Sequence, residues 1–157
     1  MTDQLTADEL QAAGTKRPTA VSVLVALSAL LVYRAFGFVQ LANVGELPDG
    51  APESWFVPLF GDGVVGTALL VTAILLWKRA TPGVWLTAVI VHFLAMWDTA
   101  AAAINNGRNP WDASDFADVM WFLFGFVFLV SAVSVYLLSR VDVRRHYGVY
   151  GVNHGLQ

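Results

Sequence analysis

The chain has 157 residues, of which 57% are hydrophobic and only 13% charged, with a formal net charge of −3. An average soluble domain carries about 25% charged residues, and a chain this short that also crosses a membrane leaves too little mass for a soluble catalytic domain. It contains no cysteine, which excludes disulfides, thiolate metal sites, cysteine nucleophiles and iron–sulfur clusters.

Residues 1–17 form a predicted cytoplasmic tail. The first 15 residues carry acidic but no basic side chains, the opposite of a secretory signal, so the first apolar segment is expected to stay in the mature protein. Thr6 and Glu9 have the spacing of a capping box, and Leu5 and Leu10 are placed as a hydrophobic staple. A short capped helix is therefore predicted in this tail.

Four apolar runs follow, each with about the 20 residues needed to cross a hydrocarbon core of roughly 30 Å. The loops between them are short, which favours antiparallel packing of consecutive spans. The sequence thus predicts an all-α polytopic membrane protein, an up-down-up-down four-helix transmembrane bundle over residues 18–140 with a cytoplasmic tail at 141–157. The predicted spans are 21–42, 56–77, 84–104 and 119–138.

Basic residues at the span ends predict the orientation. They occur before the first span, between the second and third, and after the fourth, whereas the other two connections carry only Arg108. The positive-inside rule then places both termini in the cytoplasm, with the protein in the cell (plasma or inner) membrane. The basic residues on the predicted inner side are Lys16, Arg17, Lys78, Arg79, Arg140, Arg144 and Arg145.

Tryptophans support these boundaries, because amphipathic rings prefer the two headgroup belts. Trp97 and Trp121 lie somewhat deeper, and for these two the stacking of a ligand is an alternative to interface anchoring. The tryptophans at the span ends are Trp55, Trp77, Trp85 and Trp111.

Three formal charges lie inside the predicted spans: Arg34, Asp62 and Asp98. At 1.5 Å per residue from the predicted outer ends, Arg34 is about 12 Å deep and the two carboxylates are about 9 Å deep. One cation and two carboxylates from three helices therefore fall at nearly one level in the outer half of the bilayer. The outer ends of the helices add further polar candidates: Gln40, Asn43, Asn105 and Asp118.

Arg34 is expected to bridge Asp62 and Asp98. An ionised side chain near a span centre costs roughly 2.5–3.5 kcal/mol on insertion scales, so such groups face the bundle interior and pair, and a guanidinium offers five donors in a flat fork. One interpretation is a structural lock that fixes helix register. Another is a site where the surplus negative charge binds a proton, a cation or a cationic ligand. In a third, Asp62 merely caps the second span, although Ser54 is a better-placed cap.

Small residues are spread over all four spans and permit close helix approach. Gly37 lies in the first span, Gly63 and Gly66 in the second, the alanine run 100–103 in the third and Gly125 in the fourth. The glycines around Asp62 are expected to bring the neighbouring helices within reach of its carboxylate.

His92 lies close to mid-membrane. A histidine that hydrogen-bonds a neighbouring helix is the expectation, with proton shuttling or axial ligation of haem iron as alternatives. Haem as a cofactor would need a second axial ligand from Met96, Met120 or another copy of the chain. His92 and Asp98 are about 120° apart around the helix, so a direct pair is not expected. No metal site is predicted.

The absence of known sequence motifs limits the possible functions. No Walker A, HExxH or GxSxG motif occurs, and no basic patch indicates nucleic-acid binding. The leading interpretation is a small accessory or structural protein of a homo-oligomer or larger membrane complex. The first alternative is an ion-, proton- or small-ligand-binding or transport protein that uses the Arg34 cluster. The second is a haem- or quinone-binding anchor that uses His92.

Two stretches carry a family resemblance: "LLVYRAFGFVQLANVG" in the first span and "GTALLVTAILLWKR" at the end of the second. Their layout resembles that of DoxX-type small four-helix membrane proteins. The resemblance covers less than a third of the chain and rests on an arginine followed by glycine in an apolar helix. It implies the four-helix layout and no residue roles.

Overall fold

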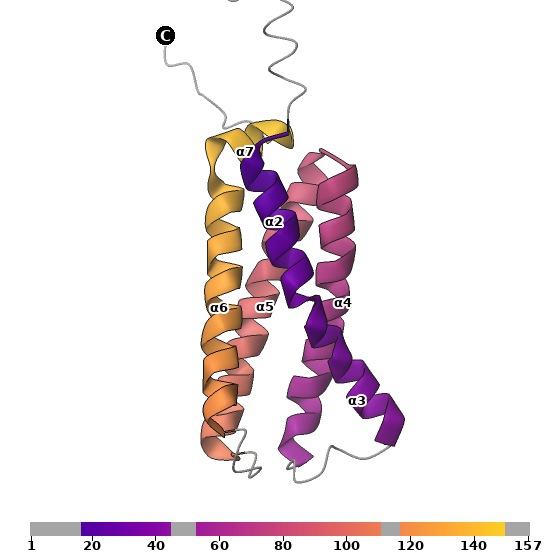
Figure 1. Cartoon of the computed structure of the whole chain (residues 1–157), viewed down its shortest axis with the longest axis vertical. Coiled ribbons are helices and arrows are strands. Elements are labelled where there is room, and N and C mark those ends of the chain that lie inside the picture. The colour runs from indigo at the N-terminus through magenta and orange to yellow at the C-terminus, as the bar shows by residue number, and fades with distance from the viewer. Residues whose placement is uncertain (1–16, 45–52, 111–116, 150–157) are drawn as a thin grey trace, which may run out of the picture.

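The computed structural model describes residues 17–44, 53–110 and 117–149, apart from the side chains of residues 40, 42–44, 117 and 118. The helix predicted around Thr6 lies outside this part of the chain. Within it, every regular element is a helix (Figure 1). In chain order they are α2 (Thr19–Leu30), η1 (Leu31–Ala35), α3 (Phe36–Val44), η2 (Glu53–Trp55), α4 (Phe56–Lys78), α5 (Pro82–Arg108), α6 (Ala117–Ser139) and α7 (Val141–His146).

Four helical stretches are long and apolar enough to cross a membrane. Each coincides with one predicted span to within four residues at either end. The prediction of an all-α chain with four candidate spans is therefore confirmed, and the protein is a small multi-pass membrane protein. The stretches are Thr19–Val39, Glu53–Lys78, Pro82–Arg108 and Val119–Ser139.

The first span differs from the prediction of one continuous α-helix. The 3₁₀ segment η1 separates α2 from α3. A 3₁₀ helix has three residues per turn, so each residue of η1 advances the chain about 20° further around the axis than in an α-helix. The inward-facing side of the span therefore shifts between α2 and α3. Arg34 lies in this segment and is buried.

Two apolar clusters fill the interior of the bundle. Each draws residues from the first span and from α4, α5 and α6, so the four spans share one core. The end cluster consists of Val21, Leu24, Leu76, Val84, Ala88, Leu138, Val143 and Tyr147. The central cluster consists of Leu31, Val65, Leu69, Val91, Ala95, Val127 and Val130.

The helix α7 closes the bundle at the end where α2 begins (Figure 1). No helix was predicted in the tail 141–157. Gly148, at φ 71°, donates from its N–H to the carbonyl of Arg145 at 3.0 Å, as in a Schellman motif. Tyr147 is buried there, and its hydroxyl donates to the carbonyl of Leu76 at 3.0 Å. Burial raises the pKa of Tyr147 to about 12, so the hydroxyl keeps its proton.

Glycines bring α4 against the first span. A Cβ atom at Gly66 would fall on the backbone of Ala35, and one at Gly37 would fall on the carbonyl of Leu59. Only glycine allows the helices to approach this closely. Gly125 is exposed, with nothing within 4 Å of its Cβ position. The prediction that it supports close packing within the bundle is therefore wrong.

Residues 61–66, "GDGVVG", have the glycine spacing of a dinucleotide-binding turn. That fingerprint requires a strand before it and a helix that starts within it. All six residues lie inside α4, so this requirement is not met. The glycines serve helix packing instead.

We expect Gly66→Ala to lower the free energy of unfolding by about 1–3 kcal/mol, because the added methyl group overlaps the backbone of Ala35 and forces the helices apart. The matched control is Gly107→Ala near the end of α5, which meets no neighbour and exchanges glycine for a better helix former. Unfolding in mixed micelles, followed by tryptophan fluorescence, measures both. Equal stability of the two variants would contradict the close packing.

Candidate functional site: an arginine between two aspartates

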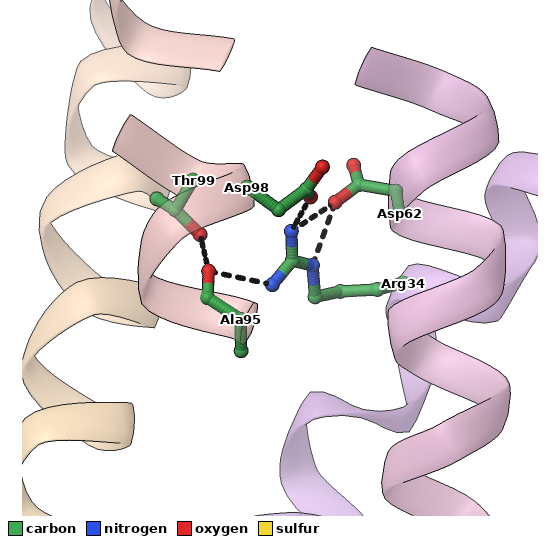
Figure 2. A network of polar contacts seen from close by, with 5 residues as sticks. All are labelled: Arg34, Asp62, Ala95, Asp98 and Thr99. Carbon is green, nitrogen blue, oxygen red and sulfur yellow. Dashed lines mark hydrogen bonds and ion pairs between the residues drawn. The ribbon is translucent and has the colours of Figure 1, made fainter. Parts of the chain in front are cut away.

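Arg34 lies in η1, with only 4% of its surface exposed. Its guanidinium reaches two other spans. Nε donates to Asp62 Oδ1 at 2.6 Å, Nη2 donates to Asp98 Oδ2, and Nη1 donates to the carbonyl of Ala95 at 3.3 Å. Nη2 also forms an ion pair with Asp62 Oδ1. Figure 2 shows the guanidinium in contact with both carboxylates, which approach it from the same side, so the predicted bridge is confirmed.

Asp62 lies in the second turn of α4, which begins at Phe56. It therefore does not cap the helix, and that interpretation is wrong. The suggested cap at Ser54 is also wrong, since Ser54 lies in η2 and no side chain caps the start of α4. The 3₁₀ turn η2 leads directly into α4. The carboxylate of Asp62 is thus free to serve Arg34.

Asp98 approaches α4 across a glycine. A Cβ atom at Gly61 would fall on the Asp98 carboxylate, so any larger residue at this position would displace the acid. One turn earlier on α5, the carbonyl of Ala95 accepts from Arg34 Nη1 and also from Thr99 Oγ1 at 2.7 Å. Ala95 is not among the predicted site residues, because a backbone carbonyl leaves no signal in the side-chain pattern.

The cluster of Arg34, Asp62 and Asp98 carries a formal charge of −1 when all three groups are ionised. The arginine side chain is 3% exposed, whereas those of Asp62 and Asp98 are 35% and 19% exposed. In Figure 2 the second oxygen of each carboxylate points away from the guanidinium, and both lie on the same side of it. The guanidinium is therefore shielded from the surroundings. The second oxygen of each carboxylate can still accept a hydrogen bond from another group.

The outer polar candidates do not all join this cluster. Asn105 lies seven residues beyond Asp98, about 10 Å along α5. Its Oδ1 accepts from Asn109 Nδ2 at 3.4 Å, so its side chain belongs to the end of the helix. The side chains of Gln40 and Asp118 lie outside the described part of the structure.

His92 is fully buried on α5. Its Nε2 is 3.1 Å from Ser28 Oγ on α2, the expected hydrogen bond to a neighbouring helix. Nδ1 has no hydrogen-bond partner among the described residues. Haem ligation through Nε2 would require the bond to Ser28 to break. Asp98 lies about 9 Å further along the same helix.

The tryptophans divide into outward-facing and buried side chains. Trp97 and Trp121 are largely exposed on the outside of the bundle, so neither is placed to stack on a ligand inside it. Trp55 is buried, and its Nε1 donates to the carbonyl of Asn109 at 3.0 Å. It ties the start of α4 to the end of α5 rather than acting only as an interface anchor. Trp111 lies outside the described residues.

Comparison with known proteins adds no identity: no protein-family model, curated protein or solved structure matches this chain. The resemblance to DoxX-type proteins therefore gains no support. Across residues 17–44, 53–110 and 117–149, no group of three or more His, Asp or Glu side chains is arranged to hold a metal ion.

Proposed function

We propose that this protein is a small structural or accessory membrane protein whose fold depends on Arg34 as a lock between three spans. One observation supports this most directly: a single buried guanidinium uses Nε, Nη1 and Nη2 to bind groups on α4 and α5, while its own backbone belongs to the first span. Separating any of these spans leaves a charge uncompensated in a low-dielectric interior. The lock therefore holds their relative register.

Both termini are proposed to lie in the cytoplasm, in an up-down-up-down arrangement. Hydrogen bonds gather the basic segments at one end of the bundle. Arg17 donates to the carbonyl of Trp77 at 2.6 Å and lies over its ring, while Tyr147 joins the chain after α7 to the end of α4. The positive-inside rule assigns this end to the cytoplasm. The basic residues in these segments are Arg17, Lys78, Arg79, Arg140, Arg144 and Arg145.

The accessory role implies a protein partner in the membrane, and a second copy of the chain is the simplest one. Gly125 lies on an exposed face of α6 with open space at its Cβ position. Phe122 and Leu129, three residues before and four after it, are exposed on the same face. A glycine between two large apolar side chains allows a partner helix to approach closely.

A second candidate function is the binding of a proton or a small cation, favoured by the ratio of two carboxylates to one guanidinium. Like charges that share a site disfavour full ionisation of both acids. The partly exposed second oxygens of Asp62 and Asp98 would be the binding atoms. In this case the Arg34 cluster is a site with an occupant rather than a lock alone.

A charge-removal series tests the lock. We expect Asp62→Asn/Asp98→Asn to lower the free energy of unfolding by about 3–5 kcal/mol, because it leaves a lone buried guanidinium. Arg34→Gln should cost less, since the two carboxylates it leaves behind are partly exposed. The triple variant should recover part of the loss. Unfolding in mixed micelles measures all three, with Asp142→Asn, in an exposed pair with Arg140, as the control that changes nothing.

The same series separates the lock from the binding role. Under the lock, a change of pH between 5 and 9 or an exchange of Na⁺ for K⁺ shifts the melting temperature of the wild type no more than that of the triple variant, which keeps the buried His92. Under the binding role the wild-type melting temperature changes with one of these variables, and the triple variant loses that response while remaining folded. If Arg34→Gln is as stable as the wild type, the lock is rejected.

The orientation of the chain in the membrane is tested with single introduced cysteines. Because the chain has no cysteine of its own, any labelling comes from the introduced residue. Gly83 and Gly107 lie near opposite ends of α5, both exposed and with open space at their Cβ positions, so cysteine fits either. On intact cells, a membrane-impermeant maleimide should label Gly107→Cys. Gly83→Cys should react only after permeabilisation. The reverse pattern would overturn the N-in, C-in assignment.

Self-association is tested at the Gly125 face. Light scattering in mild detergent should give the wild type a mass above that of one chain. Gly125→Leu should shift it towards the monomer, because the larger side chain fills the space a partner helix needs. Gly107→Leu serves as the control, since it adds the same bulk at the end of α5. A wild type that stays monomeric in detergent and in bilayers contradicts the proposed homo-oligomer.

A further inference from the structure

A layer of polar side chains separates the two apolar clusters of the bundle. Each of the four spans contributes at least one hydroxyl or imidazole that is buried to 99% or more. We call this set, Ser28, Thr72, His92 and Ser131, the polar layer. Along the chain, Ser28, Thr72 and Ser131 each lie between a residue of the central cluster and a residue of the end cluster, whereas His92 directly follows Val91, the central-cluster residue on α5 that lies nearest the end cluster. The flanking pairs are Leu24 and Leu31 around Ser28, Leu69 and Leu76 around Thr72, and Val130 and Leu138 around Ser131.

Helix register puts His92 and Ser131 at one level. Trp85 Nε1 donates to the carbonyl of Leu138 at 2.8 Å, and residues later on α5 pack with residues earlier on α6. His92 is seven residues after Trp85, and Ser131 is seven before Leu138. Seven residues are close to two helical turns, so both side chains return to the contacting faces about 10 Å further on. Ser28 joins this level through its contact with His92.

Three polar atoms of the layer have no hydrogen-bond partner among the described residues: His92 Nδ1, Thr72 Oγ1 and Ser131 Oγ. A hydroxyl in a transmembrane helix can satisfy itself by donating to the carbonyl four residues earlier, but Thr72 and Ser131 do not do so. The hydroxyls that do are those of Thr67, Thr87, Thr99 and Ser134.

The chemistry of these atoms selects a small uncharged ligand. A buried polar group without a partner is costly, and native proteins satisfy such groups with protein atoms or with ordered water. The layer contains no carboxylate to hold a cation and no arginine or lysine to hold an anion. Water both donates and accepts and needs two to four polar partners. An imidazole nitrogen and two hydroxyls from three helices supply them.

We propose that the polar layer is an internal hydration site, in which water molecules bind to His92 Nδ1, Ser131 Oγ and Thr72 Oγ1 in the middle of the bundle. The site is separate from the Arg34 cluster and does not depend on the proposed lock. Water at this site would hydrate the region between the two apolar clusters. It also gives the buried His92 ring a proton that exchanges with water.

Water-to-protein magnetisation transfer in solid-state NMR tests this directly. The full chain, labelled with ¹⁵N-histidine, is placed in lipid bilayers. The variant His146→Gln/His154→Gln assigns the His92 ring, because it removes the other two histidines of the chain. We expect the His92 ring to receive magnetisation from water at mixing times similar to those for the half-buried His146 of the wild type. Transfer to His146 with none to His92 would overturn the proposal.

Stability gives an independent test of the two hydroxyls. Thr72→Val and Ser131→Ala should each lower the melting temperature, because the replacement leaves bound water with one partner fewer. Ser134→Ala is the matched control, since its hydroxyl is equally buried on α6 but bonds within its own helix at 2.9 Å. If both variants melt at or above the wild-type temperature, no water is bound to these two hydroxyls and the proposed site is wrong.

Discussion

The buried guanidinium of Arg34 is the constraint on which the rest of this structure depends. An arginine deep in an apolar bundle is tolerated only if its donors are satisfied and its charge is balanced. Two carboxylates and a backbone carbonyl on α4 and α5 meet that requirement. The first three spans therefore have to meet at one level. Apolar burial alone imposes such a level less strictly, because it is non-directional.

The backbone around the cluster is shaped to make those contacts. Arg34 lies in the 3₁₀ segment η1, where the inward-facing side of the first span shifts around the helix axis. Gly66 admits the backbone of Ala35, and Gly61 admits the Asp98 carboxylate. A side chain at either glycine would separate the helices, lengthen the ion pairs and raise the cost of the buried charge. Close packing and electrostatics are thus coupled, since the charges need short distances and the glycines make those distances available.

Along its length the bundle alternates between polar and apolar levels. The Arg34 cluster is followed by the central cluster, the polar layer, the end cluster and finally α7, where the Tyr147 hydroxyl bonds the end of α4. The polar levels contribute directional bonds between helices, which in the polar layer is the bond between Ser28 and His92, and the apolar levels supply non-directional burial. A bundle built in this way has a specified register at both ends and in the middle.

The sequence by itself determined the four spans and the meeting of Arg34 with Asp62 and Asp98. Hydropathy reports what lipid tolerates, and three isolated charges at equal depth have few ways to be neutralised other than by one another. Only the tertiary structure decided the 3₁₀ turn, the part played by the Ala95 carbonyl, the helix α7 and the polar layer. A serine or threonine in a transmembrane helix gives little hydropathy signal, because it can bond to its own backbone. Whether Thr72 and Ser131 do so depends on what the neighbouring helices place beside them, and that is a property of packing rather than of local sequence.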